Sequence, residues 1–152
     1  SVRVKGVDLA PRPGIWPNAW EWHQGDLFEF FDNEVGEVEG VVANLFLHHF
    51  TDEQLRRLGS LISSSAGRLL FSEPARYELH RAQGRMGFPF FNPVTRHDMM
   101  VSIEAGFRED ELASILGLDS DEWSWKVTRT FWGAYRLEAN RNIADEATIS
   151  FS

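Results

Sequence analysis

Two adjacent histidines, His48 and His49, offer the most versatile chemistry in this sequence. An imidazole can take a proton from a nucleophile near neutral pH, so a well-placed histidine can act as a general base. Neighbouring residues point in different directions, so at most one of the two readily faces a site. The alternative is one structural histidine and one exposed one. The catalytic residue stays open among His49, His97 and Glu73, in that order, and His97 with Asp98 could instead begin a helix.

Composition excludes several other kinds of site. The chain of 152 residues has no cysteine, and no ligand spacing links its histidines, so we expect no metal site. A net charge of −8 argues against binding to nucleic acid or to an anionic membrane surface. No apolar run approaches the roughly 20 residues that a membrane span needs. A cytoplasmic enzyme is therefore the expectation.

The elements around the histidines predict where they lie. Residues 41–43 are small or β-branched and predict a strand buried on both faces, which ends at Asn44. Thr51 and Gln54 have the spacing of a capping box, so a helix should begin there. Ligands of an open α/β sheet bind at the carboxyl ends of its strands, which places the candidate site at residues 44–50.

Strand and helix patterns alternate along the rest of the chain. This order predicts an α/β fold with a mostly parallel, Rossmann-like sheet. The last two strands are joined by a short link and should be antiparallel, because a parallel crossover needs a longer connection. The expected strands lie at residues 2–8, 19–24, 41–43, 68–72, 122–131 and 133–139.

These patterns resemble the class I S-adenosylmethionine-dependent methyltransferases of small molecules. The resemblance covers residues 2–139, and its strongest motif is VVANLFLHHF at residues 41–50. Asp8 at a strand end, Gly25–Asp26 and a strand closing on Glu73–Pro74 support it. The family's first strand and its glycine-rich turn, E/D-x-G-x-G-x-G, have no counterpart here. We therefore expect a sheet that is incomplete at the N-terminus.

The missing turn also bears on the domain organisation. We expect residues 1–139 to be the C-terminal part of a methyltransferase domain and residues 140–152 to be a polar tail.

The resemblance also implies which residues bind the cofactor S-adenosylmethionine. Asp8 would accept hydrogen bonds from the ribose hydroxyls, Asp26 would face the adenine amino group, and Leu27 would pack on the adenine ring. Asn44 and Leu45 would line the methionine end. Each position has a structural alternative: a solvated strand-end acid for Asp8, a turn residue for Asp26 and a core side chain for Leu45.

The reaction implied by the resemblance is methyl transfer to a small-molecule acceptor by direct displacement. A homodimer is a further expectation. The alternative function is a non-catalytic binding or dimerisation module related to methyltransferases, which the missing glycine-rich turn favours. A nicotinamide-dependent Rossmann enzyme is disfavoured by the antiparallel final strands and the missing fingerprint.

Overall fold

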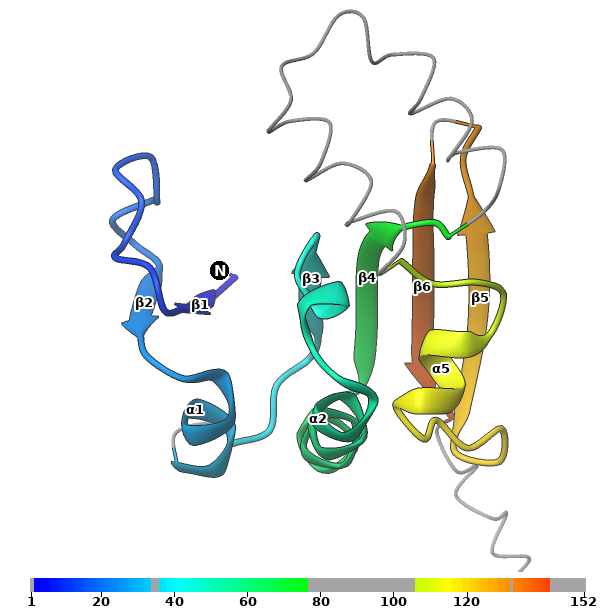
Figure 1. Cartoon of the computed structure of the whole chain (residues 1–152). Helices are drawn as coiled ribbons and strands as arrows, with labels where there is room; N and C mark the ends of the chain where they lie inside the picture. The colour runs from blue at the N-terminus through cyan, green and yellow to red at the C-terminus, as the bar shows by residue number, and fades with distance from the viewer. Residues whose placement is uncertain (1, 34–35, 77–105, 132, 143–152) are drawn as a thin grey trace, which may run out of the picture. The chain divides into compact units, whose positions relative to one another are not determined.

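Two β-sheets organise the chain in the computed structural model, which describes residues 2–33, 36–76, 106–131 and 133–142 (Figure 1). The first sheet belongs to a unit that spans Ser1–Val38, and the second belongs to a unit that spans Glu39–Ser152. Each unit is described by itself below. Among the described residues, no helix is both long and apolar enough to cross a membrane.

The first unit is a parallel strand pair followed by a helix. Strand β1 (Lys5–Asp8) pairs with β2 (Glu21–Gln24), and both lie within the ranges expected from the sequence. Helix α1 (Leu27–Asn33) follows and buries Phe28 and Phe30.

A tryptophan cluster fills the connection between β1 and β2. The ring centroid of Trp16 lies 5.4 Å from that of Trp20 and 5.0 Å from that of Trp22. Gly6 makes room for this cluster, because a Cβ atom there would lie 2.7 Å from the Trp22 ring and 2.8 Å from the Trp16 ring. Arg12 ties the connection together by donating to the backbone oxygen of Trp16.

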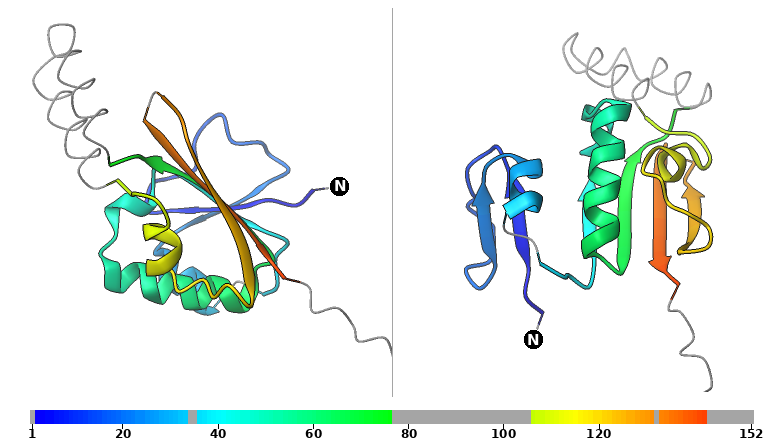
Figure 2. Two further views of the ribbon diagram at one scale, coloured as in Figure 1. Left: turned by 90° about the vertical axis from the view of Figure 1, so that its right-hand side faces the viewer. Right: turned by 90° about the horizontal axis from the view of Figure 1, so that it is seen from below.

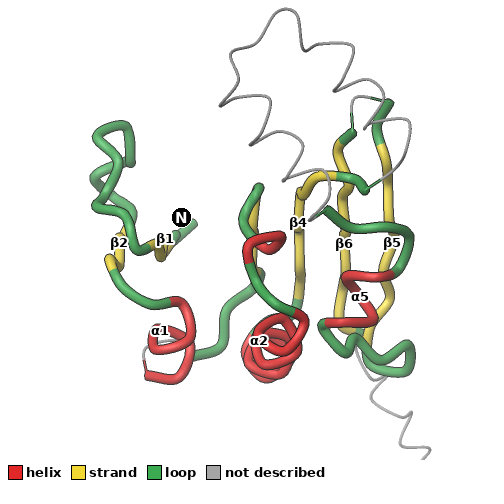
Figure 3. The backbone as a smooth tube through the Cα atoms, viewed as in Figure 1, coloured by secondary structure: helices red, strands yellow, loops and turns green. Residues whose placement is uncertain are grey.

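The second unit contains a four-stranded sheet in the order β3-β4-β6-β5 (Figure 3). Its strands are β3 (Val41–Asn44), β4 (Arg68–Pro74), β5 (Trp123–Arg129) and β6 (Ala134–Arg141). Strands β3 and β4 are parallel, whereas β6 is antiparallel to both β4 and β5. The prediction of an antiparallel C-terminal pair is therefore confirmed, and β6 continues two residues past the expected end of the strand.

One face of this sheet is covered by helices α2 (Asp52–Ser65) and α5 (Glu111–Ile115) (Figure 2). The capping box of α2 is present as predicted: the Thr51 hydroxyl accepts from the Gln54 backbone, and the Gln54 side chain accepts from the Thr51 backbone. The buried side chains between helices and sheet include Leu55, Leu58, Ile62, Phe71 and Leu137.

The opposite face of the same sheet is open in the described part of the chain. The exposed fraction is 73% for Val42 and 46% for Leu70, and both point to this face. The prediction that residues 41–43 are buried on both faces is therefore wrong, because Val42 is exposed and Val41 and Ala43 are only half-buried. The described helices of this unit lie on one face only, so a strand whose composition suits a doubly covered sheet is half covered here.

Candidate functional site

The turn that follows β3 has a strained backbone at the carboxyl end of that strand. Leu45 has a φ of 51°, in the left-handed region that residues other than glycine rarely adopt. Its N–H donates to the backbone oxygen of Ser72, at a nitrogen–oxygen distance of 2.8 Å. Strain of this kind persists only where surrounding contacts enforce it, and it is concentrated at functional sites.

Those contacts come from Glu73 near the end of β4. Its side chain accepts hydrogen bonds from the backbone N–H groups of Phe46 at 3.1 Å and Leu47 at 2.9 Å, both to Oε1. The Oε2 atom lies 2.7 Å from Nδ1 of His48 and 3.4 Å from the His48 backbone nitrogen. Glu73 is 1% exposed, and it is the one buried acidic residue among those the structure describes. A buried carboxylate needs such partners, because burial of an unpaired charge is very costly.

The two histidines differ in their surroundings. Both lie in the short helix η1 (Leu47–His49), yet the His48 side chain is only 5% exposed and contacts Glu73, while His49 is exposed. Their ring centroids lie 4.1 Å apart with the planes tilted by 38°. One histidine is satisfied inside the structure and the other faces solvent, which is one of the two arrangements considered for them.

Several candidate residues of the second unit are therefore brought together. Asn44, Leu45, Glu73 and His49 lie at the carboxyl ends of β3 and β4, which are hydrogen-bonded neighbours. Asn44 and Leu45 are both exposed, so their side chains are accessible to a ligand. His97 lies outside the described residues.

The other candidates lie together in the first unit. Asp8 ends β1, and its backbone oxygen accepts from the Gly25 N–H, next to Asp26. The Asp8 side chain accepts one hydrogen bond through Oδ1, from the Ala10 N–H at 2.8 Å. A carboxylate has about four acceptor positions, so this bond leaves capacity for the two hydroxyl donors of a ribose.

Asp26 also has a structural role. Its Oδ1 accepts from the backbone N–H groups of Phe28 at 2.8 Å and Glu29 at 3.1 Å, so it caps α1. Its side chain is otherwise exposed, and the following Leu27 is half-buried. The cap is compatible with a ligand on the remaining oxygen.

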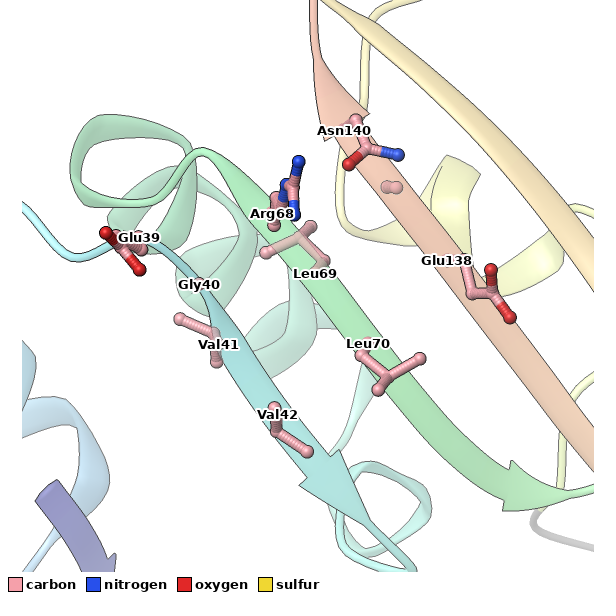
Figure 4. Close-up of a pocket in the computed structure, with 10 residues that line it drawn as sticks. Glu39, Gly40, Val41, Val42, Arg68, Leu69, Leu70, Glu138 and Asn140 are labelled. Atoms are coloured by element: carbon pink, nitrogen blue, oxygen red, sulfur yellow. The ribbon is translucent and has the colours of Figure 1, made fainter. Parts of the chain in front are cut away.

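A depression of about 370 Å³ lies elsewhere, on the open face of the second sheet (Figure 4). It is lined at the start of β3 and β4 by residues such as Val41, Arg68 and Leu69, and by Glu138 of β6. This is the amino end of β3, opposite to the turn with the histidines. Ligands of α/β sheets bind at the carboxyl ends, so the turn is the better candidate site. Within the described ranges, no group of three or more His, Asp or Glu side chains could hold a metal ion.

The contact between Glu73 and His48 was not expected from the sequence. Strand alternation could have indicated that Glu73 is buried. Leu69, Phe71 and Glu73 occupy the same face of β4, and the first two are apolar. A carboxylate that continues a buried face must find donors, and the nearest strand end supplies them here.

No protein-family model matches this sequence, and no curated protein sequence matches it. Solved structures do resemble it. The plantazolicin methyltransferase BamL, in complex with a triazolic desmethylPZN analog and SAH, is 8% identical with a TM-score of 0.65. The match covers 92% of this chain and 68% of the BamL chain.

Two further matches agree. The N-methyltransferase NodS from Bradyrhizobium japonicum WM9 is 15% identical with a TM-score of 0.54, over 92% of this chain and 73% of that one. A putative O-methyltransferase from Nostoc punctiforme PCC 73102 is 13% identical with a TM-score of 0.53, over 82% of this chain but only 36% of that one. These matches show that the chain has the class I methyltransferase fold, with a mostly parallel sheet and antiparallel C-terminal strands.

Proposed function

We propose that this chain is part of an S-adenosylmethionine-dependent methyltransferase that acts on a small-molecule acceptor. The observation that carries the proposal is the strained turn at Leu45, at the carboxyl end of β3, in a fold shared with enzymes of this class. The solved neighbours methylate different acceptors, so the acceptor of this chain is not assigned.

The resemblance implies which of the chain's own residues would hold the cofactor. Asp8 is half-buried at a strand end with acceptor capacity left for the ribose, and the exposed Asn44 and Leu45 would line the methionine end. Asp26 and Leu27 would hold the adenine. When bound, the cofactor supplies an activated methyl group whose bond to sulfur breaks with the electron pair remaining on sulfur.

Residues at the turn after β3 would remove the proton from the acceptor. His49 is exposed on the connection that follows β3, and it would accept the proton that an acceptor O–H or N–H group releases. Glu73 is the weaker candidate for this role, because its carboxylate already accepts hydrogen bonds from the turn. Positioning and proton removal are the protein's share of such a reaction.

Calorimetric titration of the full-length protein with S-adenosylhomocysteine tests the proposal. We expect binding, and we expect Asp8→Asn to weaken it by about ten- to a hundredfold, because charge-assisted hydrogen bonds are worth about 1.5–3 kcal/mol. The matched control is Glu21→Gln, which removes an equal charge at an exposed position of β2 in the same unit. Absence of binding heat at millimolar ligand would contradict the proposal.

The alternative, a non-catalytic binding or dimerisation module, also has an observation in its favour. Val42 and Leu70 form an exposed apolar surface on the open face, beside the unpaired edge of β3 in the described sheet. Exposed apolar patches often mark association surfaces. Self-association in sedimentation experiments together with a lack of S-adenosylhomocysteine binding would favour the module.

A further inference from the structure

The hydrogen bonds around Glu73 bear on which atom donates in its contact with the His48 ring. Oε1 faces two backbone N–H groups, those of Phe46 and Leu47, and Oε2 faces the N–H of His48 as well as its ring. Backbone N–H groups can only donate. An ionised carboxylate can only accept, so beside an ionised Glu73 the Nδ1 of His48, 2.7 Å from Oε2, is the donor.

If the His48 ring is neutral, this pattern specifies its tautomer. A neutral imidazole carries one proton, so a proton on Nδ1 leaves Nε2 as an acceptor. With its side chain 5% exposed and its Nδ1 bonded to a fully buried carboxylate, the His48 ring has a fixed orientation. It is a rigid platform next to the exposed His49 ring, 4.1 Å away between centroids.

We propose that Glu73, His48 and His49 form a positioning chain: Glu73 fixes the tautomer and orientation of His48, and the His48 ring holds the exposed His49 imidazole at the carboxyl end of β3. Glu73 and His48 are positioning residues in this scheme. The proposal rests on the proposed function in one respect, which is that His49 is the group that meets the acceptor. A ring packed against a fixed neighbour has fewer orientations to lose when it engages a substrate.

Nuclear magnetic resonance with ¹⁵N-labelled histidine rings, recorded on the full-length protein, tests the positioning chain of Glu73, His48 and His49. In the wild type, we expect His48 to carry its proton on Nδ1. In Glu73→Gln, the side-chain oxygen should stay with the two backbone donors at Phe46 and Leu47, which leaves the amide NH₂ facing Nδ1. His48 must then accept, so its proton should move to Nε2.

Two variants separate positioning from simple stability. His48→Asn places an amide NH₂ near the position of Nδ1, so it keeps a donor for Glu73 while it removes the ring. We expect the ring-proton shifts of His49 to move toward those of a free histidine in this variant. Glu53→Gln, at an exposed carboxylate of α2, should leave both histidines unchanged.

The outcomes distinguish the positioning chain from the proposed function. A wild-type His48 with its proton on Nε2 would contradict the positioning chain. Ring-proton shifts of His49 that do not change in His48→Asn would also contradict it. Either result is available even if Glu73→Gln does not fold. Added S-adenosylhomocysteine should shift the His49 ring signals. If those signals do not shift while His48 has the expected tautomer, the positioning chain is supported and the proposed function fails.

Discussion

Asp26 caps a helix and is also a candidate for a ligand contact. Its Oδ1 caps α1 by accepting from two backbone N–H groups, and a carboxylate at a helix start is also favoured by the helix dipole. The sequence left Asp26 open between a turn residue and an adenine contact. The structure shows a cap, and the adenine contact stays a prediction.

Substitutions at Asp26 can separate these roles. Asp26→Ala removes the cap and should lower the free energy of unfolding by about 1 kcal/mol. Asp26→Asn keeps a good cap, so stability should hold, while affinity for S-adenosylhomocysteine should fall about tenfold if the carboxylate also faces adenine. Urea unfolding and calorimetry measure the two effects. Unchanged stability in Asp26→Ala would disprove the cap, and unchanged affinity in Asp26→Asn would remove the adenine contact.

Local chemistry decided which residue roles were predictable. The Thr51–Gln54 capping box is set by two side chains three residues apart, so the sequence alone showed it. The contact of Glu73 with His48 joins residues 25 positions apart and depends on the pairing of β3 with β4. No local pattern contains that information.

At the scale of elements, Gly59 allows α2 to pack against Leu116, the residue that follows α5. A Cβ atom at this position would lie 1.9 Å from the backbone oxygen of Leu116, which is far closer than atoms can approach. Gly59 is buried in the middle of α2, where glycine is otherwise a poor helix former. The close approach explains why a glycine is found there.

Gly59→Ala should therefore destabilise the protein. The overpacking cost of about 1–3 kcal/mol should exceed the gain of about 1 kcal/mol in helix propensity. Urea unfolding measures the difference, with the neighbouring exposed Ser60→Ala as control, which we expect to change stability by less than about 0.5 kcal/mol. A Gly59→Ala variant as stable as the wild type would show that α2 and Leu116 can separate freely.

The sequence predicted strands better than it predicted their surroundings. The short link between β5 and β6 required an antiparallel pair, because chain length alone excludes a parallel crossover. The apolar run of β3 indicated burial on both faces, yet Val42 is 73% exposed. Composition reports what a strand can pack against, but coverage depends on which other segments are present beside it.

At the scale of the whole molecule, the two units differ in how much structure supports them. Strands β1 and β2 have four residues each, whereas β4 and β6 have seven and eight and lie inside the four-stranded sheet. Two-stranded sheets are marginally stable by themselves. The first unit should therefore open more readily than the second.

Hydrogen exchange can measure this difference. We expect the backbone amides of β1 and β2 to exchange about tenfold faster or more than those of β4 and β6, after correction for intrinsic rates. The backbone amides of Phe28 and Glu29 in α1 donate hydrogen bonds to Asp26. They should exchange at rates similar to those of the β1 and β2 amides, because they belong to the same unit. Equal protection throughout would mean that the two units open together as one cooperative body.

The tryptophan cluster beside Gly6 has a spectroscopic consequence. Indole rings whose centroids lie 5.0 Å and 5.4 Å apart, at steep angles, are close enough for their electronic transitions to couple. Trp16, Trp20 and Trp22 all belong to the first unit, whereas Trp123 and Trp125 belong to the second. The coupled circular dichroism band of the cluster therefore provides an intrinsic optical reporter of the first unit, and it needs no added label.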